Sequence, residues 1–290
     1  MTVILSPDPR HLVEPAHAKL NLALHVRARQ ADGYHALETI FAFTAFGDTL
    51  GAEPAATLSL TIDGDYAGPA GGGDDNLVLR AARALAAAAG VPARAALHLT
   101  KRIPVAAGLG GGSADAAAAL RLLNRMWGLG YDRAALETVA AGLGADVPAC
   151  VASQPCLGTG RGERLHPIDP GVDGLPVLLI NPRVAVPTGP VFAAWDGQDR
   201  GALDPAADLR DLRNDLTAPA VRLAPVIADV LDWLATRPGL VLGRMSGSGA
   251  SVFGLFGDMA SAAAASRAVP ARWWSTYTSL RRPGGDGGPR

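Results

Sequence analysis

Apolar and polar residues alternate from Ala18 to Val26, where the sequence reads AKLNLALHV. Leucines and a valine form one face of this pattern, and Lys19, Asn21 and His25 form the other. A period of two predicts a half-buried β-strand. A turn at Asp32-Gly33 and the apolar run LETIFAFTAF follow, so we expect a hairpin. The polar face of the first strand either converges on a ligand or is an ordinary solvated face.

The rest of the first half reads as helices separated by one strand. The predicted elements are a helix from Asn76 to Gly90, a strand at Leu97–Ile103, and helices at Ala114–Trp127 and Asp132–Ala141. Asp146 then stands just before Pro148, at an expected new helix start.

Glycines and prolines interrupt the pattern at GTGRGE and again at residues 182–190, which predicts a domain boundary near residue 160. The second half alternates strands and helices and is therefore α+β. Its expected strands are Val177–Asn181, Leu240–Gly243 and Ser251–Phe256, and its expected helices are Arg222–Thr236 and Met259–Val269. The tail PGGDGGPR, residues 283–290, is predicted to be disordered.

A glycine-rich segment, IPVAAGLGGGSADAA from Ile103 to Ala117, connects the predicted strand to a helix expected to begin at Ser113. Glycines allow backbone N–H groups to approach an anion closely, and a helix N-terminus adds unpaired donors, so the segment suits polyphosphate. It is neither a Walker A loop, which needs a lysine where Gly112 stands, nor a dinucleotide fingerprint, which needs a glycine at Ser113. The alternative is a glycine turn capped by Ser113.

Composition narrows the class of partner. The chain has 290 residues and a net charge of -1, which gives no electrostatic footprint for nucleic acid or an anionic membrane. No segment is long and apolar enough to span a membrane, and the amino terminus does not resemble a signal peptide, so we expect a cytoplasmic protein. Cys150 and Cys156 have no metal-ligand spacing and are expected to be buried thiols.

Arginine is used almost everywhere that a basic residue occurs. Of 26 basic residues, only Lys19 and Lys101 are lysines. A compact ammonium group is not interchangeable with the larger, planar guanidinium, so these two lysines are candidates for function. The alternative is that two lysines remain in an arginine-rich chain by chance.

Several motifs in order resemble the GHMP small-molecule kinases. PAHAKLNLALHV is similar to their first motif, PVAAGLGGGSADAA to their phosphate loop and MSGSGAS to their third motif. The resemblance implies an α+β, two-domain fold: a ribosomal-S5-like α/β domain at residues 1–160, a ferredoxin-like domain at residues 161–282, and an active site in the cleft between them. GYHALETIF, LGADVPAC and NDLTAPA are similar to members that phosphorylate the C2 hydroxyl of a cytidine diphosphate-linked methylerythritol.

The same resemblance implies two catalytic residues. Asp146 would be the general base that takes the proton of the acceptor hydroxyl, and Lys19 would lie beside it. A nearby ammonium favours the ionised carboxylate and stabilises the developing alkoxide.

Binding residues are also implied by the resemblance. ATP would contact Asn76, Lys101, Pro104, Gly108, Leu109, Gly110, Gly111, Gly112 and Ser113, and the hydroxyl of Ser113 would reach either phosphate or Mg²⁺. The acceptor would contact Asn21, Tyr34, His35, Thr188, Phe192, Gly247, Ser248 and Gly249. In this arrangement Tyr34 and Phe192 stack on the cytosine ring, His35 reads its polar edge, and the 247–249 loop closes over the diphosphate.

Two positions depart from the pattern of that group: Ala114 replaces a second serine and Ala36 replaces a glutamate. Neither carries a proposed chemical role, so we expect them to adjust affinity only. Two alternatives remain open: a kinase for another alcohol, such as homoserine or mevalonate, and a sensor that binds nucleotide and sugar without turnover. The expected partner is a small molecule, and the protein is expected to be a monomer or homodimer.

Overall fold

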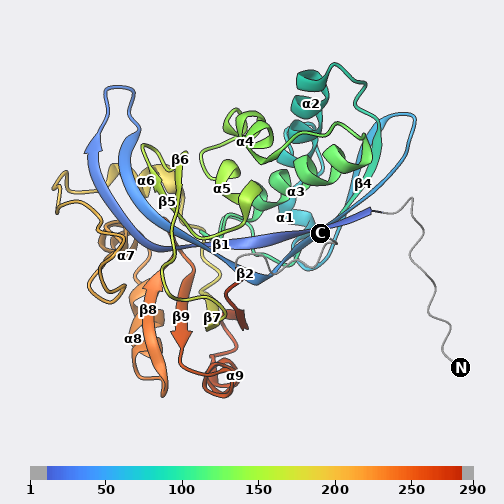
Figure 1. The fold of residues 1–290 in the computed structure, drawn as a ribbon. Coiled ribbons are helices and arrows are strands. Elements are labelled where there is room, and N and C mark those ends of the chain that lie inside the picture. The colour runs from blue at the N-terminus through green and yellow to red at the C-terminus, as the bar shows by residue number, and fades with distance from the viewer. Residues whose placement is uncertain (1–11, 283–290) are drawn as a thin grey trace, which may run out of the picture. The chain divides into compact units, whose positions relative to one another are not determined.

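A computed structural model describes residues 12–282. These residues form two compact units, each described separately below (Figure 1). Unit 1 contains the described residues up to Ala16, Gly47–Val105 and Gly112–Val151. Unit 2 contains His17–Phe46, Ala106–Gly111 and the described residues from Ala152 onward. The units interleave along the sequence, whereas the sequence predicts a single boundary near residue 160, and that division stays a prediction. The tail predicted to be disordered, residues 283–290, lies outside the described residues.

Two long strands contribute residues to both units. They are β1 (Leu12–Arg29) and β2 (His35–Glu53), and they pair with each other. The hairpin is therefore confirmed, with Gly33 at φ 85° in its turn. The alternation was misleading about burial, because Lys19, Asn21 and His25 are as buried as the leucines on the other face. Tertiary packing covers both faces of this strand.

Unit 1 is mainly helical. Its elements are β3 (Leu58–Asp63), α1 (Ala67–Ala70), α2 (Leu77–Ala89), β4 (Ala95–Thr100), most of α3 (Gly111–Met126), α4 (Arg133–Ala141) and most of α5 (Val147–Ala152). Strand β4 lies between β3, its parallel partner, and the antiparallel second part of β2. Helix α2 lies where the sequence predicts a helix between Asn76 and Gly90. Asn76 caps it by accepting from the Val78 N–H, and Gly90 ends it in the left-handed conformation.

Unit 2 contains a second, four-stranded sheet in the order β10-β7-β9-β8. Its elements are β5 (Cys156–Thr159), β6 (Arg164–Pro167), β7 (Pro176–Asn181), α6 (Thr188–Ala193), α7 (Thr217–Leu223), α8 (Val226–Ala235), β8 (Leu240–Met245), β9 (Val252–Phe256), α9 (Met259–Ala268) and β10 (Trp274–Ser279). Helices α8 and α9 pack on this sheet (Figure 1). Strands β5 and β6 form a hairpin beside the first part of β2.

One predicted helix is wrong. The stretch from Arg222 to Thr236 is not continuous, because α7 ends at Leu223 and α8 begins at Val226. Pro225 separates them, and a proline removes the N–H that a continuous helix would need. Cys150 and Cys156 are buried, as expected.

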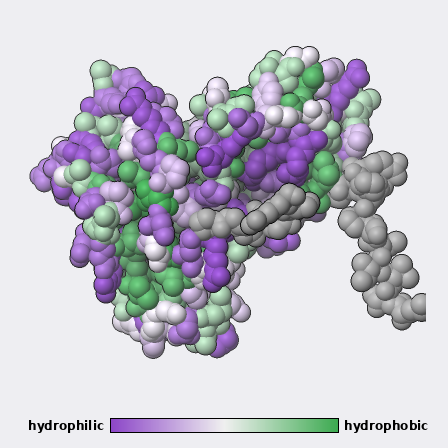
Figure 2. Space-filling model, in the orientation of Figure 1, coloured by the Kyte–Doolittle hydropathy of each residue, from purple (hydrophilic) through white to green (hydrophobic). Residues whose placement is uncertain are grey.

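The face drawn in Figure 2 is hydrophilic over much of its area, with hydrophobic residues gathered around α8 and β8. Val241 of β8 is about half exposed, and scattered apolar residues of this kind are ordinary on protein surfaces. Within residues 12–282, no helix has the length and apolar character needed to cross a bilayer.

The backbone of Lys101 packs so closely against Gly64 that only glycine fits at this position. Its φ is 90°, and a Cβ there would lie 2.4 Å from the carbonyl oxygen of Lys101. We expect Gly64→Ala to unfold more easily than Gly33→Ala by about 1–3 kcal/mol, since overpacking adds to the strain of positive φ. Gly33 is the matched control because its φ is 85° and nothing lies within 4 Å of its Cβ position. Urea unfolding of both variants tests this, and equal losses would contradict it.

Candidate active site

The middle of the glycine-rich segment belongs to unit 2. Ala106, Gly108 and Gly110 all have positive φ, so the backbone alternates in handedness through the loop. Such a path turns successive N–H groups toward one side, the arrangement that binds anions. A Cβ on Gly108 would lie 2.6 Å from the Ser246 carbonyl oxygen, and one on Gly110 would lie 3.0 Å from Cε of Lys19. Both glycines are needed for close approach.

Helix α3 begins at Gly111, two residues before the expected start. Ser113 therefore lies inside the first helical turn and does not cap the helix, which excludes the simple capped-turn interpretation. The first N–H groups of an α-helix have no partner within the helix, so this end of α3 still offers donors to a phosphate. Gly112 is exposed, Pro104 and Leu109 are buried, and Ser113 is partly exposed.

Lys101 lies in a buried cluster with two carboxylates of unit 1. Its ammonium group donates to an Oδ2 of Asp48 and, over 2.7 Å, to Oδ2 of Asp115. Asp48 also accepts from the backbone N–H groups of Arg102 at 2.5 Å and Ile103 at 2.8 Å. The resemblance places the backbone around Lys101 near the adenine of ATP, which stays a prediction, and Asp48 has no role assigned from the sequence. The side chain of Lys101 holds the end of β4 against the first turns of α3.

The charges in this cluster do not balance, because two carboxylates surround one ammonium. Burial opposes the charged form of Lys101, but attraction to Asp115 and Asp48 outweighs it and raises the lysine pKa. Burial raises the pKa of Asp115 to about 8, and repulsion from Asp48 adds to this, while Lys101 opposes it. Oδ1 of Asp115 has no hydrogen-bond partner among the described residues.

A second polar chain runs through unit 2 from Lys19. The Lys19 ammonium donates to Oδ1 of Asn21 at 2.9 Å, and Nδ2 of Asn21 donates to Oγ1 of Thr39 at 2.8 Å. The backbone N–H of Lys19 donates to the Leu109 carbonyl at 2.9 Å, which ties β1 to the glycine loop. Lys19 and Asn21, predicted to share one face, are thus brought together with that loop.

The third-motif loop also packs against the glycine loop. Oγ of Ser246 donates to the Gly108 carbonyl at 2.9 Å and accepts from the Asn21 N–H at 3.2 Å. A Cβ on Gly247 would lie 3.1 Å from Oδ1 of Asn21. Oγ1 of Thr188 and Oγ of Ser248 are 3.0 Å apart, so two predicted acceptor contacts adjoin each other.

Two aromatic rings lie next to the imidazole of His35. Its ring centroid lies 5.1 Å from that of Phe192 and 5.7 Å from that of Trp195. Burial, and then the charge of Arg29, lowers the pKa of His35. The neutral imidazole has one donor and one acceptor, as needed to read a polar edge. Tyr34, the adjacent residue, is 58% exposed.

Two remaining predicted residues lie in unit 1. Asn76 uses its side chain locally, because Nδ2 donates to the Gly71 carbonyl at 2.7 Å while Oδ1 caps α2. Asp146 directly precedes α5 and is partly buried. The pairing of Asp146 with Lys19, which belongs to unit 2, stays a prediction.

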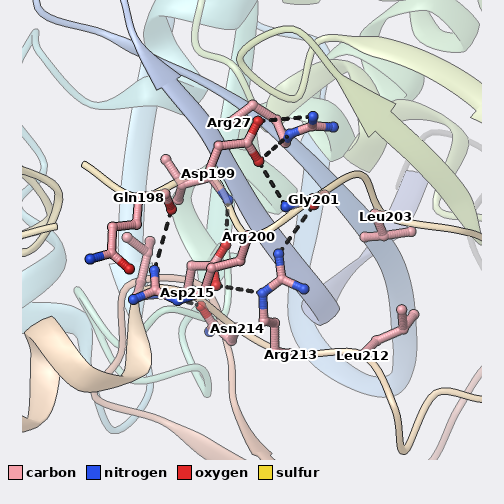
Figure 3. Close-up of polar contacts among 12 residues, drawn as sticks. Arg27, Gln198, Asp199, Arg200, Gly201, Leu203, Leu212, Arg213, Asn214 and Asp215 are labelled. Carbon is pink, nitrogen blue, oxygen red and sulfur yellow. Dashed lines mark hydrogen bonds and ion pairs between the residues drawn. The ribbon is translucent and has the colours of Figure 1, made fainter. Parts of the chain in front are cut away.

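The motif NDLTAPA contains two residues, Asn214 and Asp215, whose structural roles were not predicted from the sequence. Nδ2 of Asn214 donates to the carbonyls of Met245 and Gly247, both at 2.8 Å, and so supports the third-motif loop. Asp215 accepts from the Val26 N–H at 2.8 Å and pairs with Arg213. Figure 3 shows how this motif lies beside residues 198–203, which the two arginines Arg27 and Arg213 tie down. The one signal in the sequence for this role was the position of Asn214 directly after the charged stretch at residues 208–213.

The buried arginine of β8 was also missed. The guanidinium of Arg244 donates to three backbone carbonyls, those of Leu22, Leu209 and Leu212. Burial lowers its pKa to about 10, which leaves it charged at neutral pH. It therefore joins β1 to the loop that precedes Asn214.

Comparison with known proteins identifies the class of protein to which these features belong. Residues 76–154 match the family described as GHMP kinases N terminal domain, and residues 198–275 match GHMP kinases C terminal. The chain belongs to the GHMP kinases and is a small-molecule kinase, a class that uses ATP as phosphoryl donor. The resemblance and the fold class predicted from the motifs are thereby confirmed.

Particular relatives extend over nearly the whole chain. It is 56% identical over 285 residues to a 4-diphosphocytidyl-2-C-methyl-D-erythritol kinase from Rhizorhabdus wittichii, a match that covers 95% of this chain and 97% of that protein. The crystal structure of a 4-(cytidine 5'-diphospho)-2C-methyl-D-erythritol kinase is 36% identical, with a TM-score of 0.82 and coverage of 93% of this chain and 100% of the other. A homoserine kinase from Cytophaga hutchinsonii has a TM-score of 0.72 at 17% identity, covering 97% and 99%, and shares the fold.

The Lys101 cluster gives a direct stability test. Lys101→Met is expected to lower the free energy of unfolding by about 3–5 kcal/mol, because two buried carboxylates lose their shared cation. Arg102→Ala is the control: the neighbouring side chain is exposed, and the backbone N–H that Asp48 accepts is retained. Urea unfolding measures both. If only the backbone of Lys101 mattered, the two variants would unfold alike.

Proposed function

We propose that this protein transfers the γ-phosphoryl group of ATP to the C2 hydroxyl of 4-diphosphocytidyl-2-C-methyl-D-erythritol. This reaction belongs to the methylerythritol phosphate pathway of isoprenoid biosynthesis. The observation that carries the proposal is the contact of His35 with Phe192 beside exposed Tyr34, since aromatic rings and a neutral imidazole suit a pyrimidine base. The relatives named for this activity support it.

In this proposal unit 2 binds the acceptor. Tyr34 and Phe192 stack on the cytosine, and His35 contacts its polar edge with the donor and acceptor of a neutral ring. Thr188 and Ser248 present two adjoining hydroxyl groups, and Gly247 and Gly249 present backbone amides to the diphosphate. Asn21, already bonded to Lys19 and Thr39, holds the ammonium in position.

ATP binding relies on backbone more than on side chains. The amides of Gly108, Gly110, Gly111 and Gly112 face the phosphates, with the N-terminus of α3 favouring negative charge. The adenine lies near Asn76 and the backbone of Lys101, because both side chains are engaged elsewhere. Pro104 and Leu109 are both buried within this segment.

Magnesium would be held mainly by the nucleotide. Residues 12–282 contain no group of three or more His, Cys, Asp or Glu side chains that could bind a metal. Mg²⁺ commonly keeps waters and takes one or two protein oxygens with substrate phosphates, so the single partly exposed hydroxyl of Ser113 fits. When bound, the ion neutralises charge on the transferring phosphoryl group.

Catalysis then needs one proton transfer. Asp146 accepts the proton of the C2 hydroxyl, the hydroxyl oxygen attacks the γ-phosphorus, and ADP leaves. Lys19 stabilises the developing negative charge on that oxygen. Most of the remaining rate enhancement comes from alignment of the two substrates. We further propose a cytoplasmic enzyme, monomeric or homodimeric, that acts on small molecules without nucleic acid or membrane.

The test of the proposal is acceptor choice. ADP release is measured with purified protein, ATP and Mg²⁺ against 4-diphosphocytidyl-2-C-methyl-D-erythritol, homoserine and mevalonate. We expect release with the cytidine compound alone. Release only with homoserine or mevalonate would replace the proposed acceptor, and nucleotide binding without release from any acceptor would favour the sensor.

Replacement of the base separates chemistry from binding. Asp146→Asn is expected to lower kcat by about 10²–10⁴-fold, the usual contribution of a general base, while the calorimetric Kd for ATP stays unchanged. Asp65→Asn, which changes an exposed carboxylate of unit 1, is the control. Near-normal turnover in Asp146→Asn would show that another group accepts the proton.

A further inference from the structure

The GTGRGE segment, which the sequence identifies only as an interruption, forms the turn of the β5–β6 hairpin and carries Arg161 at its tip. The Arg161 guanidinium lies over the ring of Tyr34, with its central carbon 4.0 Å from the ring centroid. Its Nη2 also pairs with Oδ2 of Asp32, in the turn of the β1–β2 hairpin. All three residues belong to unit 2.

Backbone geometry holds Arg161 in this place. Gly160 and Gly162 on either side have φ of 75° and 107°, conformations that favour glycine. The Leu37 N–H donates to the Gly160 carbonyl at 2.7 Å, which fixes the turn to β2. The Arg161 N–H donates to Oε2 of Glu163 at 2.6 Å. The guanidinium thus projects from an anchored turn.

Tyr34 is held by the same contacts. Oδ1 of Asp32 accepts from the Tyr34 N–H at 3.1 Å, while the other oxygen of this carboxylate holds Arg161. One carboxylate therefore links the backbone of Tyr34 to the cation stacked on its ring. Tyr34 remains 58% exposed even though the Arg161 guanidinium lies over its ring.

We propose that Arg161 is a positioning residue for the pyrimidine of the acceptor, acting through Tyr34. The stacked guanidinium fixes the plane of the tyrosine ring, so that its other face is a preformed platform for the base. A ring already held in its bound orientation loses less freedom on binding, which improves affinity for the acceptor without changing phosphoryl transfer. This inference rests on the proposed cytidine acceptor.

The inference predicts a split in kinetic constants. Arg161→Ala is expected to raise KM for 4-diphosphocytidyl-2-C-methyl-D-erythritol about two- to fivefold, the range that an exposed cation–π contact supplies, with kcat and the KM for ATP unchanged. Arg164→Ala is the matched control, because it removes a cation from the same hairpin. The side chain of Arg164 is 76% exposed, and its one ion pair among the described residues is with neighbouring Glu163. An equal rise in both variants would mean a general charge effect and would overturn the inference.

A double-mutant cycle shows whether Arg161 acts through Tyr34. In the Tyr34→Ala background, Arg161→Ala is expected to have no further effect on the acceptor KM. A persistent effect there would mean direct contact with the acceptor and would refute positioning. Wild-type turnover of the cytidine acceptor is measured first: its absence contradicts the proposed function, whereas normal wild-type turnover with an unchanged KM in Arg161→Ala contradicts this inference alone.

Discussion

The buried ammonium of Lys101, shared by two carboxylates, is the interaction on which the phosphate loop depends. Asp48 comes from β2, Lys101 from the end of β4 and Asp115 from the first turns of α3, so one cluster fixes both ends of the glycine-rich segment. Charges removed from water are tolerated only when paired and hydrogen-bonded, and Asp48 meets this need with two backbone donors as well. A guanidinium is larger and planar and does not replace a compact ammonium in such a buried cluster without rearrangement, which accounts for one of the two lysines in this arginine-rich chain.

The second lysine, Lys19, donates a hydrogen bond to the neutral side chain of Asn21. Lys19, Asn21 and Thr39 form a chain of hydrogen bonds that runs across paired strands, and Ser246 and Asn214 extend the support to the third-motif loop. Such networks are rigid when every member is satisfied. The functional groups proposed for the acceptor are therefore carried on strands and braced loops, whose positions are better defined than those of free loops.

Local signals in the sequence predicted local structure well. The helix start at Asn76, the stop at Gly90 and the strand, loop and helix of the phosphate segment all depend on near neighbours. Contacts between distant residues left no such signal: Asp48 lies 53 positions from Lys101, and Asp32 lies 129 positions from Arg161. For the same reason the alternation in β1 gave the strand correctly and its burial wrongly, since burial is decided by what packs on it. The proposed roles of Asp146 and Lys19 in catalysis rest on resemblance alone.

The interleaving of the two units has a consequence for how the chain is dissected. It passes from one unit to the other five times, after residues 16, 46, 105, 111 and 151. The excursion at 106–111 carries Gly108, whose carbonyl is bonded by Ser246 from the far end of the sequence. A cut anywhere between residues 108 and 246 would leave the hydrogen-bonded Gly108 and Ser246 on different fragments. Separate expression of halves, circular permutation and gene fusion should therefore respect these crossings rather than a midpoint in the numbering.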